Sequence, residues 1–144
     1  MSPRELDARV VHARLGLMRD LLDDLDAVGP VNVDGLRHDR MLRHAVERIL
    51  TQLVELAVSV NGHVAATVFG KAPADYRSSF DVMESGGILS QELADRLRRS
   101  AGLRNLLAHE YARIDLALVA AAVPAARDDY RQYVRLIVGW LKDK

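Results

Sequence analysis

The stretch "MLRHAVERILTQLVELAVSVNGHVAATVF", residues 41–69, carries apolar side chains at helical spacing along its whole length. The repeating positions are Met41, Ala45, Ile49, Leu53, Leu56, Val60 and Val64. The pattern predicts one helix from about Asp34 or His38 to Phe69, roughly thirty residues and somewhat over ~40 Å long. A helix of this length is typical of the central element of a helical bundle.

Upstream of this stretch, residues 6–25 repeat the same pattern, with leucine or another apolar residue every three or four positions. The resulting apolar stripe predicts an amphipathic helix that ends at Gly29 and Pro30. Downstream, breakers flank "GKAPADYRSSFDVMESGG". We expect a loop there, a short helix from about Ala74 to Glu84, and a turn at the two glycines that follow.

Two more helices complete the chain. Ser90 is a good N-cap for a helix that has Glu92 in its first turn and leucines on one face. A last helix is predicted from Asp115 to about Leu141, and Pro124 should kink or restart it, because proline removes a hydrogen bond. No segment alternates like a strand, so we expect an all-α antiparallel bundle of four or five helices in one domain, residues 1–144.

The composition narrows the class of function. The chain has 144 residues, no cysteine, and twenty basic residues balanced by twenty acidic ones. Disulfides and thiolate metal sites are therefore excluded, and any contact with nucleic acid must be local. The charged amino terminus lacks the unbroken apolar core of a signal peptide, and no later run approaches about eighteen uncharged apolar residues, so we expect a cytoplasmic protein without a membrane partner.

Most familiar catalytic and cofactor patterns do not occur. His38 and His44 are six positions apart, while His12 and His63 stand alone among apolar neighbours. None has metal-ligand spacing, so surface or structural roles are favoured and no metal is expected. The Gly-Lys pair at residues 70–71 lacks the rest of a phosphate-binding loop, and neither a nucleophile elbow nor a dinucleotide fingerprint is present. We expect no cofactor.

One stretch does concentrate polar chemistry: "RNLLAHEY", residues 104–111, on the helix that Ser90 begins. On a straight helix Arg104 and Tyr111 should share one face, and Asn105 and His109 a neighbouring one. Arg104 and His109 are about 140 degrees apart, too far for a compact pair. Their cooperation requires the helix to end near His109 or a second copy of the motif to face the first.

These residue types suit cleavage of RNA. Histidine titrates near neutrality and can move a proton from the substrate's own 2′-hydroxyl, and arginine can stabilise charge on the phosphorane without a metal. On the same helix, Arg96, Arg98 and Arg99 form a basic strip that would bind RNA phosphates.

Structural explanations of the same residues remain open. Arg104 could pair with Asp115 or with an acid on another helix, and His109 could be a cation favoured at a helix carboxyl terminus. Tyr111 could be a packed ring whose hydroxyl finds a backbone partner.

The motif and its surroundings resemble a known family. "RNLLAHEY" has the Arg-x4-His-x-Tyr signature of HepT-type toxins in the HEPN superfamily, and the preceding segment from "YRSSF" through the Gly-Ile turn is also similar. The resemblance implies one HEPN-like helical bundle that forms a homodimer around a shared cleft. It also implies a metal-independent ribonuclease toxin with Arg104 and His109 as catalytic residues and Asn105 assisting.

The partner that the resemblance implies is an MntA-like minimal nucleotidyltransferase antitoxin, which modifies the motif tyrosine, here Tyr111, with AMP. An adenylate near Arg104 would offer the arginine a substitute anion in place of RNA. The alternative function is a non-catalytic HEPN-like module that binds RNA or a nucleotidyltransferase. A coincidental motif on a purely structural bundle is a third interpretation.

Overall fold

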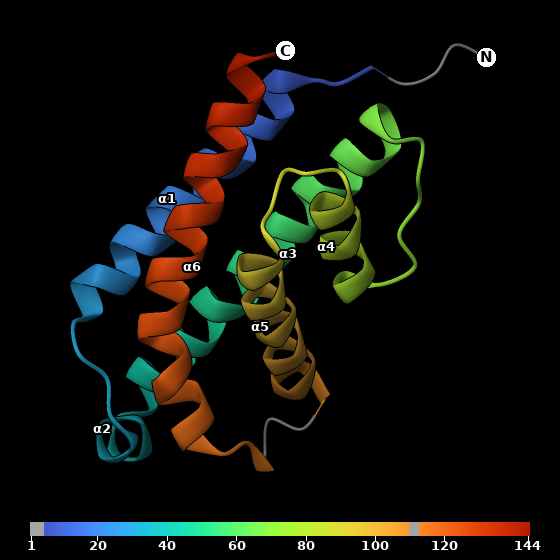
Figure 1. Cartoon of the computed structure of the whole chain (residues 1–144). Helices are drawn as coiled ribbons and strands as arrows, with labels where there is room; N and C mark the ends of the chain where they lie inside the picture. The colour runs from blue at the N-terminus through green and yellow to red at the C-terminus, as the bar shows by residue number, and fades with distance from the viewer. Residues whose placement is uncertain (1–4, 110–112) are drawn as a thin grey trace.

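The computed structural model describes residues 5–109 and 113–144, and these residues are helical or in short connections. The helices are α1 (Ala8–Val28), α2 (Val33–His38), α3 (Arg40–Val68), α4 (Tyr76–Ser85), α5 (Gln91–His109) and α6 (Leu116–Lys142). No strand occurs in the described part, which confirms the all-α prediction (Figure 1).

Each helix begins at a side chain that caps it. Free backbone N–H groups of the first turn are accepted by Asp7, Asn32, Asp39, Asp75, Ser90 and Asp115. Such caps satisfy donors that have no partner within the helix and typically stabilise it by about 1 kcal/mol. The predicted role of Ser90 is confirmed: its hydroxyl accepts from the amide of Leu93 at 3.2 Å.

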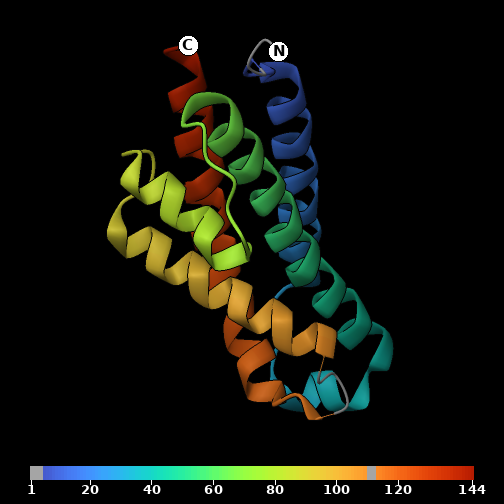
Figure 2. The same cartoon turned by 90° about the vertical axis from the view of Figure 1, so that its right-hand side faces the viewer.

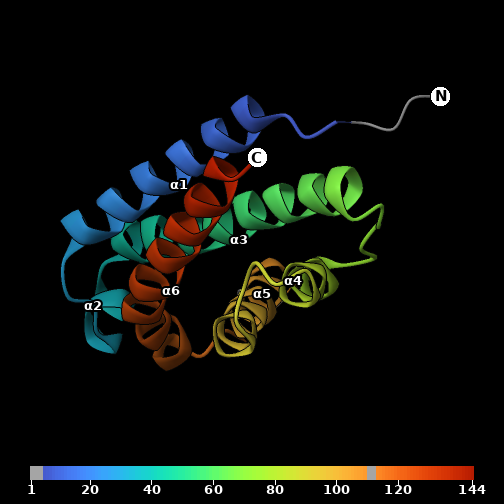
Figure 3. The same cartoon turned by 45° about the horizontal axis from the view of Figure 1, so that its top comes forward.

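The central position predicted for the long helix is also confirmed. α3 contacts all five other helices of the described part. Figure 3 shows α1 on one side of α3 and the α4–α5 hairpin on the other, with α6 crossing α3, and Figure 2 shows α4 and α5 running side by side. By length and composition α3 could cross a membrane, but half of its most apolar window is buried inside the bundle. Its apolar character is therefore that of a core helix.

Two helix boundaries differ from the sequence prediction. The predicted second helix is divided at Asp39, whose extended backbone (φ −116°, ψ 94°) ends α2 and whose carboxylate caps α3. The bundle thus gains a short sixth helix. Pro124 was expected to kink or restart the last helix. The restart does not occur, since α6 continues through Pro124 as one helix. Figure 1 shows a bend in the amino-terminal part of α6.

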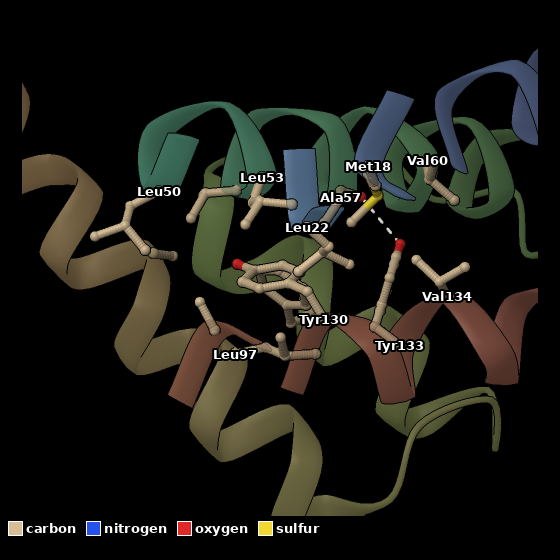
Figure 4. Close-up of a cluster of buried hydrophobic side chains, with 14 of the residues drawn as sticks. Met18, Leu22, Leu50, Leu53, Ala57, Val60, Leu97, Tyr130, Tyr133 and Val134 are labelled. Atoms are coloured by element: carbon tan, nitrogen blue, oxygen red, sulfur yellow. Dashed lines mark hydrogen bonds between the residues drawn. The ribbon is translucent and has the colours of Figure 1, made fainter. Parts of the chain in front are cut away.

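The core lies where α1, α3, α5 and α6 meet (Figure 4). Two fully buried tyrosines of α6, Tyr130 and Tyr133, pack edge to face with ring centroids 6.4 Å apart. Each hydroxyl has a partner: Ser100 for Tyr130, and both Asn61 and the Ala57 carbonyl for Tyr133. Burial raises the pKa of both phenols, so both hydroxyls stay protonated and serve as hydrogen-bonding groups within the core.

The turn that joins α4 to α5 is held close to the end of α3. A Cβ on Gly86 would lie 2.3 Å from the ring of Phe69, so only glycine fits at this approach. Gly87 adopts a positive φ of 78°, which glycine accepts without strain. The glycine turn expected from the sequence is therefore present, and it fixes how α5 starts.

Candidate active site

Helix α5 carries residues 104–109 of the motif, and its side chains divide into a buried face and an exposed face. Leu93, Leu97 and Ala101 face the core, and Leu107 continues this buried face into the motif. The side chains of Asn105 and His109 lie on the exposed side and make no hydrogen bond or ion pair with another described residue. Among the described residues of the motif, 104–109, Leu107 is thus buried, Arg104 is partly buried, and the others are exposed.

The described part of helix α5 extends to His109. Tyr111, and with it the predicted face shared with Arg104, lies outside the described residues.

Arg104 is held by two contacts with other helices. Its Nη2 donates to Oε1 of Glu55 on α3 at 2.8 Å, and its guanidinium carbon lies 4.9 Å from the ring centroid of Tyr76 at the start of α4. The arginine side chain is 20% exposed, and its Nε is buried without a hydrogen-bond partner in the described part of the chain. The alternative of an acid on another helix is confirmed; Asp115 instead caps α6.

The three arginines upstream of the motif differ in their surroundings. Arg98 donates to Asp81 at 2.6 Å, to Glu84 at 2.7 Å, and to Asp95. These contacts raise the pKa of the Arg98 guanidinium, the hydrogen bond to Asp95 most of all, and they join α5 to α4. Arg98 is therefore a structural cation in this monomer.

Arg96 and Arg99 are less enclosed. Nε of Arg96 donates to Asp129 on α6 at 2.8 Å, and its Nη2 lies 3.4 Å from the Gln132 amide oxygen. Arg99 is exposed and has no ion pair with another described residue. Of the predicted strip, Arg99 is the cation that is most available to an anion from outside.

A groove of about 610 Å³ runs between α5 and α6. We call it the α5–α6 groove; it is lined by Leu50, Arg77, Arg96, Arg99, Ser100, Gly102, Leu103, Arg104, Leu106, Leu118, Ala121, Ala122, Ala125, Ala126, Asp129 and Tyr130. Four of these residues are arginines and one is an acid, while most of the rest are apolar. The lining of the groove is therefore mostly apolar and carries a net positive charge.

One of those arginines was not singled out from the sequence. Arg77 comes from α4 and lies so close to α5 that a Cβ on Gly102 would be 3.0 Å from its Nη2. It has no ion pair with another described residue, and it lines the groove together with Arg104. The glycine on α5 makes room for this second cation beside the motif.

The remaining histidines have no arrangement that suggests catalysis. Nε2 of His63 accepts the backbone amide of Asp7 at 2.9 Å, a structural role at the start of α1. His12, His38 and His44 are exposed. Among residues 5–109 and 113–144, no group of three or more metal-ligating side chains is placed to hold a metal ion.

A family model for ribonuclease HepT-like proteins matches residues 18–137, from within α1 to near the end of α6. The chain belongs to the ribonuclease HepT-like family. It is 31% identical to tRNA nuclease HepT from Aphanizomenon flos-aquae (strain 2012/KM1/D3) over 134 residues, 92% of this chain and 90% of that protein. It is 26% identical to mRNA nuclease HepT from Shewanella oneidensis over 101 residues, 70% of this chain and 76% of that one.

A solved structure has the same fold. The tri-AMPylated Shewanella oneidensis HEPN toxin, in complex with MNT antitoxin, superposes with a TM-score of 0.82 at 21% identity. The likeness covers 90% of this chain and 97% of that one. The HEPN-like bundle expected from the sequence is thereby confirmed for this HepT-like chain. The match to the family model, residues 18–137, spans helix α5.

Proposed function

We propose that this HepT-like chain is a ribonuclease toxin that cleaves RNA with Arg104, Asn105 and His109. The observation that carries the proposal is the contrast between Arg104 and His109. Arg104 is held in place by Glu55 and Tyr76, whereas His109 is exposed and unpaired among the described residues at the end of the same helix. A fixed cation and a free proton carrier are the two groups that phosphodiester cleavage needs. Relatives named as tRNA and mRNA nucleases support the reaction class.

The mechanism that fits these groups uses the RNA's own 2′-hydroxyl as nucleophile. His109 takes the hydroxyl proton, or gives a proton to the leaving 5′-oxygen, and Arg104 stabilises negative charge that develops on the phosphorane oxygens. Asn105 shares the exposed face of His109 and is placed to orient the phosphate or the imidazole. The product of this step is a 2′,3′-cyclic phosphate, and none of its proton transfers requires a metal ion or another cofactor.

We infer that the active form is a homodimer. Arg104 and His109 point about 140 degrees apart on α5, so a second copy is the direct way to complete a compact site. Leu106 and Leu118 are 38% and 49% exposed in the α5–α6 groove, and such apolar side chains favour an interface. Leu106 and His109 are three positions apart on one helix face, so a partner that covers Leu106 also approaches His109.

For RNA binding we propose mainly Arg99, with Arg96 assisting. Arg99 is exposed and unpaired in the described part, whereas Arg96 shares its charge with Asp129. Arg98 would contribute only if it left its three carboxylates. Each phosphate neutralised by such a cation adds a salt-dependent increment to affinity.

We further propose that an MntA-like minimal nucleotidyltransferase neutralises the toxin by AMPylation of Tyr111 in the cytoplasm. The described complex of a tri-AMPylated HEPN toxin with MNT antitoxin supports this for a protein of the same fold. Transfer of AMP from ATP to the phenol forms a phosphodiester and releases pyrophosphate. Tyr111 is two positions beyond His109 in the sequence, and the negative charge added there would compete with RNA for the arginines.

The test is expression of the wild type and of Arg104→Ala, His109→Ala and Tyr111→Phe, with growth and RNA integrity followed. His44→Ala is the matched control, because His44 is an exposed histidine of α3. We expect the wild type and the control to arrest growth and degrade RNA, and the Arg104 and His109 variants to do neither.

Purified proteins separate the alternative function from the proposed one. A wild-type protein that binds RNA or the nucleotidyltransferase but leaves RNA uncut would establish a non-catalytic binding module. After incubation with the nucleotidyltransferase and ATP, mass spectrometry should show adenylate on the wild type and none on Tyr111→Phe. An adduct at another residue would reject the assignment to Tyr111.

A further inference from the structure

Arg104 is enclosed by residues of two helices that lie far from it in the sequence. Glu55 is 49 positions away on α3 and accepts from Nη2 at 2.8 Å, and Tyr76 is the first residue of α4. The Tyr76 ring lies 4.9 Å from the guanidinium carbon, within the range of a cation–π contact. One face of the guanidinium is therefore stacked and one nitrogen is paired, which restricts both rotation and translation of the group.

The backbone carbonyl of Tyr76 is the end of a chain of hydrogen bonds that starts in the core. Tyr133 on α6 donates to Oδ1 of Asn61 at 2.6 Å, and Nδ2 of Asn61 donates to the hydroxyl of Ser79 at 3.2 Å. That hydroxyl donates to the carbonyl of Tyr76 at 2.7 Å. Asn61 and Ser79 are buried, so water does not compete for these bonds. The chain ties the first turn of α4 to α3 and α6.

A capping box holds the same turn from its solvent side. The Asp75 carboxylate accepts the Ser78 amide at 2.7 Å, and the Ser78 hydroxyl accepts the Asp75 amide at 3.0 Å. The turn that presents Tyr76 is thus held both from the core and from the surface. These contacts fix the backbone position from which the Tyr76 ring extends to Arg104.

We propose that Glu55 and Tyr76 are positioning residues for Arg104, which hold its guanidinium at the α5–α6 groove that Arg104 lines. The inference rests on the proposed function, in which Arg104 stabilises the charge of the reacting phosphate. A guanidinium held before the substrate arrives needs no reorganisation when charge develops. Glu55 also carries a cost, because its negative charge weakens the attraction of the site for RNA.

This dual effect distinguishes positioning from plain structural support. Removal of Glu55 should lower kcat, because the guanidinium loses its orientation, yet RNA affinity should stay the same or rise, because a negative charge is gone. A residue that only stabilises the fold would lower activity and binding together, in proportion to the folded fraction. The ratio of the two effects is therefore the readout.

The experiment measures kcat on a fluorescent oligoribonucleotide with the full chain, and Kd for the same RNA by anisotropy in the His109→Ala background. Glu55→Ala should lower kcat by roughly tenfold or more without weakening Kd. Glu55→Gln keeps an acceptor oxygen and should restore most of kcat, with tighter RNA binding. Tyr76→Leu should lower kcat by about five- to thirtyfold, and Tyr76→Phe, which keeps the ring, should not.

Glu47→Ala is the matched control, because Glu47 is another acid of α3 that pairs with an arginine, Arg43, at 2.8 Å. It should leave both constants unchanged. Wild-type kcat in Glu55→Ala and Tyr76→Leu would overturn the inference, and so would a parallel loss of kcat and binding that follows the folded fraction seen by circular dichroism. Failure of the proposed function is visible separately, as uncut RNA with the wild type or as full activity of Arg104→Ala.

Discussion

The hydroxyl of Tyr133 is the part of the buried hydrogen-bond chain that can be removed most cleanly. Its side chain is 0% exposed, and it donates to Oδ1 of Asn61 at 2.6 Å and to the Ala57 carbonyl at 3.2 Å (Figure 4 shows the second bond). Tyr133→Phe keeps the ring and deletes one oxygen atom. The change therefore tests the hydrogen bonds with almost no loss of packing.

The expected cost follows from what is left behind. The Ala57 carbonyl remains within the hydrogen-bonded helix α3, whereas Oδ1 of Asn61 becomes a buried acceptor without a partner, which costs about 1–3 kcal/mol. With an unfolding entropy of about 2.1 cal/mol/K per residue, a chain of 144 residues loses roughly 3 °C of Tm per kcal/mol. We expect Tm to fall by about 3–10 °C.

Tyr130→Phe is the control for this measurement. Tyr130 is also buried and lies three positions away on α6, but its partner, the Ser100 hydroxyl at 2.7 Å, lines the α5–α6 groove. Ser100 can exchange its lost partner for water, so the cost should be only about 0.5–1.5 kcal/mol. Removal of the same atom from two neighbouring tyrosines thus has two different expected costs.

The assay is thermal unfolding followed by circular dichroism, with all variants at one protein concentration because association would shift Tm. The double variant Asn61→Leu with Tyr133→Phe should lose less stability than the two single variants together, since neither polar group is then left alone. The reasoning is refuted if Tyr133→Phe melts within about 1 °C of the wild type, or if the two changes add without coupling.

Three further outcomes follow from the geometry. Arg98→Ala should lower the free energy of unfolding by roughly 1–2 kcal/mol and leave RNA binding intact. Arg99→Ala should weaken RNA binding and lower the slope of log affinity against log salt concentration by about one, without loss of stability. The opposite pattern would reverse the two assignments. Leu118→Glu should convert a dimer to a monomer in light scattering, and a dimer that survives it would place the interface elsewhere; Met41→Glu, at another exposed apolar residue, is its control. Hydrogen bonds from the backbone and side chain of Ser78 lower the pKa of Asp75 in the folded protein. The loss of stability in Asp75→Ala should therefore be complete at neutral pH, and it should vanish as pH falls below the ordinary Asp pKa of 3.8 and through the lower pKa of the folded state. A loss of stability that persists in acid would exclude this linkage.

Much of the helical layout was predictable because it depends on local rules. The apolar repeat predicted α3 as the central helix, and Ser90 followed by Glu92 predicted the start of α5. Those signals concern residues within one or two turns of each other. The division at Asp39 was missed because the apolar repeat begins only at Met41 and does not locate the start of the helix, whereas the extended backbone of one residue separates α2 from α3.

The expected roles of the upstream arginines show the limit of the same reasoning. As a string, Arg96, Arg98 and Arg99 look like one basic strip, but each has a different environment once α4 and α6 pack against α5. Asp81 and Glu84 lie 17 and 14 positions from Arg98, so only the α4–α5 hairpin brings them to it. The charge available to a ligand is decided by these pairings.

The sequence by itself determined the all-α class, the long central helix, the helix that carries the motif, and the chemistry that Arg104, Asn105 and His109 can supply, because periodicity, caps and side-chain pKa ranges are local properties. Only the tertiary structure decided that Arg104 is held between Glu55 and Tyr76, and that Arg77 joins it at the α5–α6 groove. These contacts join residues far apart in the chain, and they exist because burial of the apolar faces of α3, α4 and α5 brings their polar edges together.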